Sequence, residues 1–241
     1  MRRLSRLTLI FAVLSVVFFL LLIFLRIPFN FYPLMSWQDA IDILTPLILL
    51  PIYWLMFKYS TSEPSRLAAE IAFVVLAGFW AAGQGMHLAA NSVNNLSEAL
   101  AKSNTIDILS SDIYKLTYFY DEHLGHYLWH IGVVGLAALL IVHEWKHPIG
   151  ENTRWGLVIP AGILYGFNCT LIFLEGQTIP LGFPFVILAT LLILIFGLKK
   201  IRTQPLLAFF FIAFLFAALV ITGWAVYWKG FPQPLDVVTW I

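Results

Sequence analysis

Charged side chains are scarce in this sequence of 241 residues. Asp, Glu, Lys and Arg make up 11% of it, against about 25% in soluble globular domains. Disordered segments and nucleic-acid-binding surfaces both depend on charge, so this scarcity excludes a disordered chain and a nucleic acid as partner. Cysteine is scarcer still. The single Cys169 can form neither an intramolecular disulfide nor a thiolate metal cluster.

Apolar residues take the place of the missing charges. They make up 61% of the chain, and the mean hydropathy is +0.87. A membrane-spanning helix needs about 20 mostly apolar residues, and seven stretches approach that length. We therefore expect an all-α, polytopic membrane protein in which residues 1–241 form a single bundle of seven transmembrane helices. The stretches are Leu7–Leu25, Ile41–Phe57, Leu67–Ala90, Gly125–Val142, Trp155–Leu174, Leu181–Leu198 and Leu206–Tyr227.

Lys and Arg residues are divided unequally between the two ends of these spans. Positively charged loops stay in the cytoplasm, so we expect a cytoplasmic N-terminus, an external C-terminus and a place in the cell (plasma) membrane. The longest connection, residues 91–124, then lies outside, where we expect a loop that is either a lid over a membrane site or a plain connector. The cytoplasmic side would hold Arg2, Arg3, Arg6, Lys58, Arg66, Lys146, Arg154, Lys199, Lys200 and Arg202, and the outer side Arg26, Lys102, Lys115 and Lys229.

The fourth span begins with the densest group of polar residues in the sequence. At about 100° per residue, His123, His126 and His130 fall within roughly 60° on one face of a helix, whereas Asp121 points nearly the opposite way. Glu122 lies about 40° to the side of His126. The spacing of His126 and His130 lets both imidazoles reach one metal ion.

Polar residues on three other spans fall at the same depth. Buried ionisable groups in a membrane pair with each other, bind metal or line a pathway, although a single histidine or aspartate there could equally be an interfacial residue or a helix cap. We expect His87, His126 and His130 to bind a metal. We expect catalytic roles for Asp42, Glu122 and His123. The residues expected around them are Gln84, Asn91, Trp129, Asn168 and Glu175.

The stretch from His126 to His130, with Trp129 inside it, resembles the histidine pair of the CREST superfamily. This superfamily of seven-helix membrane proteins includes alkaline ceramidases, progestin/adiponectin-type receptors and the GPI-remodelling Per1 proteins. Gly83 to His87 is similar to the run before the family's third histidine, and Asp42 to its aspartate. The family carries its pair on the last helix, whereas here the pair is on the fourth, so the resemblance covers the ligand set and not the helix order.

The resemblance implies a zinc-dependent hydrolase that cleaves an amide or ester bond of a membrane lipid reached from the outer leaflet. Zinc lowers the pKa of bound water to about 7 and polarises a carbonyl group. Imidazole also suits copper and iron, so a membrane oxidase or monooxygenase, or a subunit of one, is the first alternative. The second is a non-catalytic transporter or complex subunit. Spans one, six and seven carry few polar residues and are expected to be scaffold.

Overall fold

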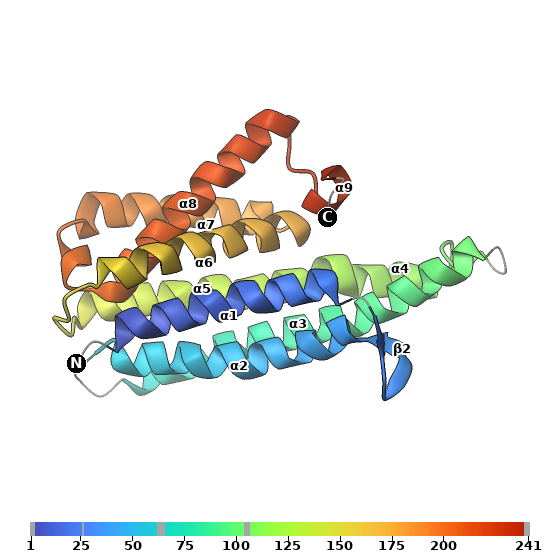
Figure 1. The fold of residues 1–241 in the computed structure, drawn as a ribbon, viewed down its shortest axis with the longest axis horizontal. Coiled ribbons are helices and arrows are strands. Elements are labelled where there is room, and N and C mark those ends of the chain that lie inside the picture. The colour runs from blue at the N-terminus through green and yellow to red at the C-terminus, as the bar shows by residue number, and fades with distance from the viewer. Residues whose placement is uncertain (1–2, 26, 62–65, 104–106, 239–241) are drawn as a thin grey trace.

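A computed structural model of the chain describes residues 3–25, 27–61, 66–103 and 107–238. It is a bundle of long helices with one small β-hairpin (Figure 1). Seven helices are long and apolar enough to cross a membrane, which confirms the expected helical, multi-pass membrane protein. These spans are Leu4–Phe24, Trp37–Tyr59, Leu67–Lys102, Asp112–Lys146, Trp155–Glu175, Ile179–Gly197 and Pro205–Trp228.

The helices follow the chain order. Helices α1, α2 and α3 form the first three spans, and α6 and α8 the fifth and seventh. The fourth span is continuous but mixed: α4 (Asp112–Tyr118) leads into a π-helical segment, η1 (Phe119–Gly125), and then into α5 (His126–Lys146). The sixth joins α7 (Ile179–Leu192) to a second π-helical segment, η2 (Ile193–Gly197). The short elements are β1 (Pro28–Phe29), β2 (Tyr32–Ser36), η3 (Lys200–Arg202) and α9 (Pro234–Val237).

The hairpin delivers the chain to the start of α2 through a capping box. The Ser36 hydroxyl accepts the Asp39 backbone N–H at 3.2 Å, and Oδ2 of Asp39 accepts the Ser36 backbone N–H at 2.6 Å. Such reciprocal bonds satisfy donors that a helix start leaves unpaired. The other oxygen of Asp39 accepts the Ser92 hydroxyl at 2.9 Å, which ties α2 to α3.

Residues 91–124 are helical over most of their length, which corrects the expectation that this connection is a loop. Helix α3 continues to Lys102, and α4 begins at Asp112 with Ser111 as its N-cap. Both extend beyond the other helices (Figure 1). The segment contains no Gly or Pro, so its polar composition does not interrupt a helix. Residues 104–106 between the two helices lie outside the described part.

Glycines allow α3 to pass very close to the fourth span. A Cβ on Gly83 would lie 2.2 Å from the backbone nitrogen of Trp129, and one on Gly132 would lie 2.5 Å from that of Trp80. Small residues at such crossings let helix backbones touch inside membranes. The crossing places the polar end of α3 directly beside the start of α5.

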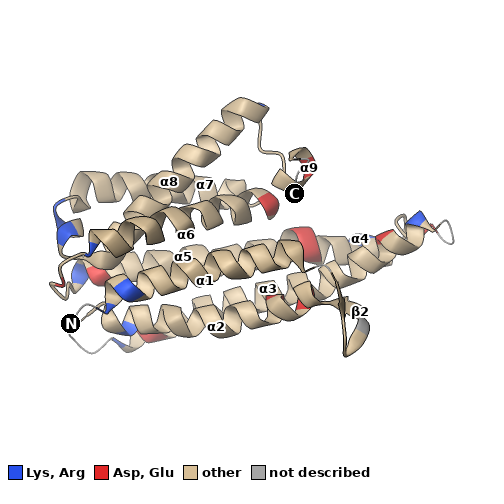
Figure 2. Cartoon of the chain, viewed as in Figure 1, with Lys and Arg blue, Asp and Glu red and all other residues tan. Residues whose placement is uncertain are grey.

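Charge marks the two ends of the bundle. Figure 2 shows Lys and Arg concentrated at the end where the chain begins, with acidic segments of η1 and the end of α6 at the opposite end. Among the described residues, the basic side chains away from the N-terminal end are Lys102, Lys115 and Lys229. The end of the bundle remote from the N-terminus is where the predicted site lies.

Candidate functional site

The predicted polar residues converge on one cavity of about 310 Å³ at the end of the bundle remote from the N-terminus. Eight of the eleven predicted residues line it: Asp42, His87, Asn91, Glu122, His126, Trp129, His130 and Glu175. Its wall also includes apolar side chains of α1, among them Phe19 and Leu22. The cavity is therefore amphipathic, with ionisable groups facing an apolar surface.

His87 is held by a carboxylate that the sequence did not predict for the site. Its Nδ1 lies 2.6 Å from Oδ1 of Asp121, and the Asp121 side chain is only 3% exposed. The amide of Asn94 donates to the other carboxylate oxygen at 2.7 Å. Asp121 is thus fixed between two α3 residues, and it fixes the His87 ring in turn.

The π-helical segment η1 accounts for the position of Asp121. A π-helix closes its hydrogen bonds from i to i+5 and has a wider turn than an α-helix, so the assumed 100° per residue does not apply from Phe119 to Gly125. Asp121 consequently faces α3. His123 does not line the cavity, and its ring lies beside those of Tyr118 and Phe119, with centroids 6.1 and 5.9 Å away.

The other two histidines follow on α5. Their rings are stacked, with centroids 5.9 Å apart and planes within 8°, and the His126 ring lies 4.4 Å from that of His87. Because a carbonyl oxygen only accepts, Nδ1 of His126 donates to the backbone oxygen of Glu122 at 3.3 Å. Nδ1 of His130 lies 2.5 Å from the Thr178 hydroxyl. Nε2 of His130 is buried and has no hydrogen-bond partner in the described part of the chain.

These positions bear on metal binding. Within the described ranges, no group of three or more His, Cys, Asp or Glu side chains is placed so that it could hold a metal ion. The three predicted ligands therefore share a cavity without forming a coordination sphere. All three have Nδ1 engaged, which leaves Nε2 as the nitrogen available to a metal, and at least one ring would have to move. Zinc binding stays a prediction.

Asp42 is held from within the bundle. The Gln84 amide donates to its Oδ1 at 2.6 Å, and Trp80 Nε1 donates to Oε1 of Gln84 at 2.7 Å. Gln84 is thus part of the support behind the cavity. Asn168 lies in a smaller neighbouring cavity of about 30 Å³ that Trp129 also lines.

A segment after the seventh span closes one side of the main cavity. Oε1 of Glu175 accepts the Leu235 backbone N–H at 2.9 Å, and its backbone oxygen accepts the Gln233 side-chain amide at 2.7 Å. Gln233, Leu235 and Asp236 all line the cavity. The scaffold role expected for span one is therefore incomplete, since α1 contributes wall residues. No described residue of span seven lines the cavity, and the C-terminal segment reaches it from beyond that span.

Comparison with known proteins gives one similarity. The chain is 26% identical over 202 residues to a ceroid-lipofuscinosis neuronal protein 6 homolog of Canis lupus familiaris, in a match covering 77% of this chain and 61% of the relative. The chain thus spans about three fifths of that relative's length. No family model matches the chain, and no solved structure matches it significantly.

This similarity corrects the resemblance inferred from the sequence. The similarity found is to a ceroid-lipofuscinosis protein and not to a CREST hydrolase. The resemblance rested on about a dozen positions around His126, Trp129, His130, His87 and Asp42. A polar helix face readily places two histidines four residues apart. A dozen matching positions are therefore too few to identify a family.

Proposed function

We propose that this membrane protein is a hydrolase that cleaves an ester or amide bond of a lipid bound in the main cavity. The observation that carries the proposal is the 2.6 Å contact between Oδ1 of Asp121, behind the cavity, and Nδ1 of His87, which lines it. An oriented histidine–carboxylate pair is the common form of a general base. The apolar wall contributed by Phe19 and Leu22 suits the chain of an amphipathic substrate.

In the proposed reaction, Asp121 fixes the His87 ring with Nδ1 toward the carboxylate and leaves Nε2 for a water molecule. His87 takes a proton from this water as its oxygen bonds to the substrate carbonyl carbon. The bond from that carbon to the leaving oxygen or nitrogen then breaks, and the proton passes to the leaving group. Glu122 and Asp42 also line the cavity, and we propose that they orient the water or assist proton transfer.

Zinc is a second element of the proposal. Metal-bound histidines usually donate their other ring N–H to a protein acceptor, and His87, His126 and His130 all have Nδ1 engaged. The buried Nε2 of His130 without a partner is consistent with a missing ligand. A zinc ion would supply a more acidic water and polarise the carbonyl. Copper and iron are the alternative metals.

Product analysis tests the hydrolase. Purified protein in nanodiscs is incubated with a defined mixture of lipid esters and amides, and released fatty acid is quantified by mass spectrometry. We expect release by the wild type and a loss of about 10²-fold or more in His87→Ala, because a general base contributes roughly 10²–10⁴-fold. His123→Ala, outside the cavity, is the matched control. Release that is equal in both variants would refute the proposal.

Metal analysis tests zinc separately. Zinc, copper and iron are measured in the purified wild type, His126→Ala and His130→Ala. One equivalent in the wild type that both variants lose would support the site, and equal content in all three would exclude it. Hydrolysis that persists in a metal-free preparation would leave the His87–Asp121 base as the mechanism.

The orientation is proposed as well. The basic end of the bundle (Figure 2) would be cytoplasmic by the positive-inside rule, so the cavity would open toward the outer leaflet of the cell membrane. Cys169 is buried, which keeps background labelling low. A membrane-impermeant maleimide on intact cells should label Ser110→Cys and leave Asn152→Cys unlabelled. Labelling of Asn152→Cys and not of Ser110→Cys would mean that the basic end faces outward.

A further inference from the structure

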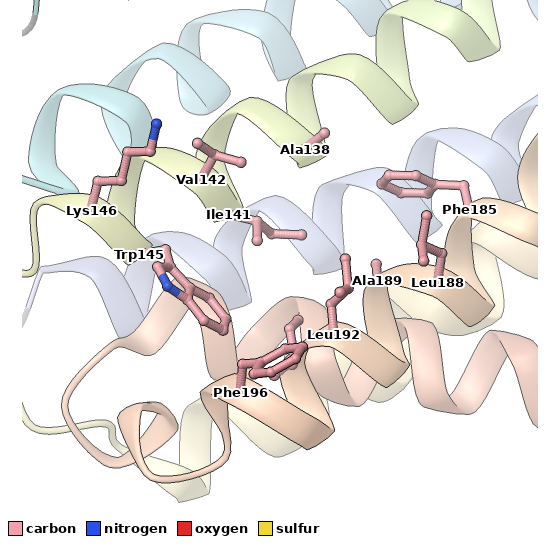
Figure 3. Close-up of a pocket in the computed structure, with 11 residues that line it drawn as sticks. Ala138, Ile141, Val142, Trp145, Lys146, Phe185, Leu188, Ala189, Leu192 and Phe196 are labelled. Carbon is pink, nitrogen blue, oxygen red and sulfur yellow. The ribbon is translucent and has the colours of Figure 1, made fainter.

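A second cavity lies near the basic end of the bundle, between α5 and the sixth span (Figure 3). Its volume is about 350 Å³. Side chains such as Ile141, Phe185, Leu192 and Phe196 make its wall apolar, and Lys146 stands at its end. We refer to this cavity as the α5–α7 groove. An apolar groove that ends at a cation matches the acyl chain and the anionic headgroup of a lipid.

Trp145 forms the basic end of the groove. The Trp145 indole packs closely against η2, since a Cβ on Gly197 would lie 2.6 Å from the Cζ3 atom of the indole. Nζ of Lys200 lies 4.3 Å from the indole ring centroid, within the range of a cation–π interaction. Tryptophan and lysine together are typical of the level at which lipid headgroups lie. The contact therefore holds a second cation beside the groove.

Lys146 also borders a cavity of about 220 Å³ on the other side of α5. Arg66 lines this cavity as well, and the two cavities share Val142 and Lys146. Figure 3 shows the Lys146 amine directed away from the apolar groove. Cations thus stand on both sides of the point where the groove ends.

No carboxylate among the described residues lines either cavity. Three glutamates at this end, Glu70, Glu144 and Glu151, lie outside both cavity walls, and the first two are engaged elsewhere. Glu70 pairs with Lys58 at 2.8 Å, and the Glu144 carboxylate accepts backbone N–H groups at the start of α8. The positive charge around the groove end is therefore not neutralised by an acidic side chain in its wall.

From this arrangement we infer a binding site for one anionic phospholipid, with an acyl chain in the α5–α7 groove and the phosphate at the groove end. There it lies beside Lys200 and within reach of the flexible Lys146 side chain once its amine turns back toward the groove. Basic pockets between membrane helices bind anionic headgroups in this manner. The excess of positive charge selects an anionic over a zwitterionic lipid. The site lies at the opposite end of the bundle from the main cavity and does not depend on hydrolysis.

Native mass spectrometry tests the inference. The detergent-solubilised full-length protein is titrated with phosphatidylglycerol and, separately, with phosphatidylcholine of identical acyl chains. We expect one phosphatidylglycerol to bind at least fivefold more tightly. Lys146→Gln with Lys200→Gln should lower that affinity about 25-fold, from about fivefold for each lysine near the surface. The same two positions changed to Arg should keep it. Equal affinity for the two lipids would overturn the inference.

Two further variants separate the groove from general charge effects. Lys115→Gln removes a cation at the opposite end and should leave the affinity unchanged; a loss equal to that of the double variant would overturn the inference. Ala138→Phe fills the groove while keeping both lysines, and it should lower the affinity at least tenfold. Ala82→Phe, on an exposed position of α3, is its matched control. Unchanged affinity in Ala138→Phe would place the lipid elsewhere and overturn the inference.

Discussion

Oδ1 of Asp121 lies 2.6 Å from Nδ1 of His87, although one residue belongs to a π-helical segment and the other to a different membrane helix. In Asp121→Asn the amide cannot stabilise a positive charge on the His87 ring, and it can hold the ring in the wrong tautomer. If His87 is the general base, hydrolysis should fall by about 10²-fold or more. The rate is measured with the lipid substrate identified by product analysis.

The control for this variant is Asp112→Asn. Asp112 lies on α4, and its carboxylate forms an exposed ion pair with Lys115 at 3.6 Å. The Asp112→Asn variant should keep the wild-type rate, because exposed ion pairs of this kind contribute little to stability. An Asp121→Asn protein that folds normally and retains full activity would show that the His87–Asp121 pair is structural.

The crossing at Gly83 supports a second prediction, this time on stability. In Gly83→Ala the new Cβ would meet the Trp129 backbone nitrogen at 2.2 Å, and backbone cannot move aside as a side-chain tip can. Overpacking costs about 1–3 kcal/mol, so Tm in detergent should fall by roughly 2–12 °C. Thermal unfolding followed by size-exclusion chromatography measures the change.

Gly78→Ala is the matched substitution on the same helix. Nothing lies within 4 Å of its new Cβ, and alanine favours a helix over glycine by about 1 kcal/mol. Its Tm should therefore equal or exceed that of the wild type. A similar fall in both variants would mean that the close crossing at Gly83 is not the cause of the lower stability.

The seven spans and the meeting of polar residues could be predicted from the sequence. Hydrophobic length fixes where a chain crosses a membrane, and the alternation of direction then places the ends of successive spans at one side. His87, His126 and Asp42 come from three helices, yet depth alone was sufficient to group them. Such reasoning works because few polar residues exist in the spans.

The contacts within the site could not be predicted. Asp121 faces α3 and His123 lies outside the cavity, contrary to an α-helical projection, because the turn at η1 is wider. No pattern in the sequence predicts this π-helix. Thr178 reaches His130 from the start of another helix, and Leu235 reaches the cavity from beyond the last span. These contacts depend on tertiary packing and not on periodicity.

Glu144 supports a third prediction, at the basic end. Its carboxylate accepts the backbone N–H groups of Leu206 at 3.3 Å and Leu207 at 2.7 Å, and so caps α8 from another helix. Pro205 before them has no N–H to satisfy. Glu144→Ala should reduce the free energy of unfolding by about 2 kcal/mol, and Glu144→Gln by less, because its amide oxygen still accepts.

The comparison for this cap is Glu70→Ala. Glu70 pairs with Lys58 at the same end, but both side chains are 33–40% exposed, so the loss should stay below about 1 kcal/mol. Chemical denaturation in mixed micelles gives both values. If the two variants are equally destabilised, the cap has no special role in stabilising α8.

The last prediction concerns access to the main cavity, because Glu175 holds the C-terminal segment through Leu235 and Gln233. In Glu175→Ala the Leu235 N–H loses its acceptor, whereas the Gln233 amide keeps the backbone oxygen of residue 175, so the segment should open more often without detaching. Diethylpyrocarbonate should then modify His126 and His130 several-fold faster, as read by peptide mass spectrometry, while His147 at the other end serves as the internal reference. Glu98→Ala, on the extended part of α3, should not change these rates. Unchanged rates in Glu175→Ala would mean that the cavity is already open and that this segment does not control entry.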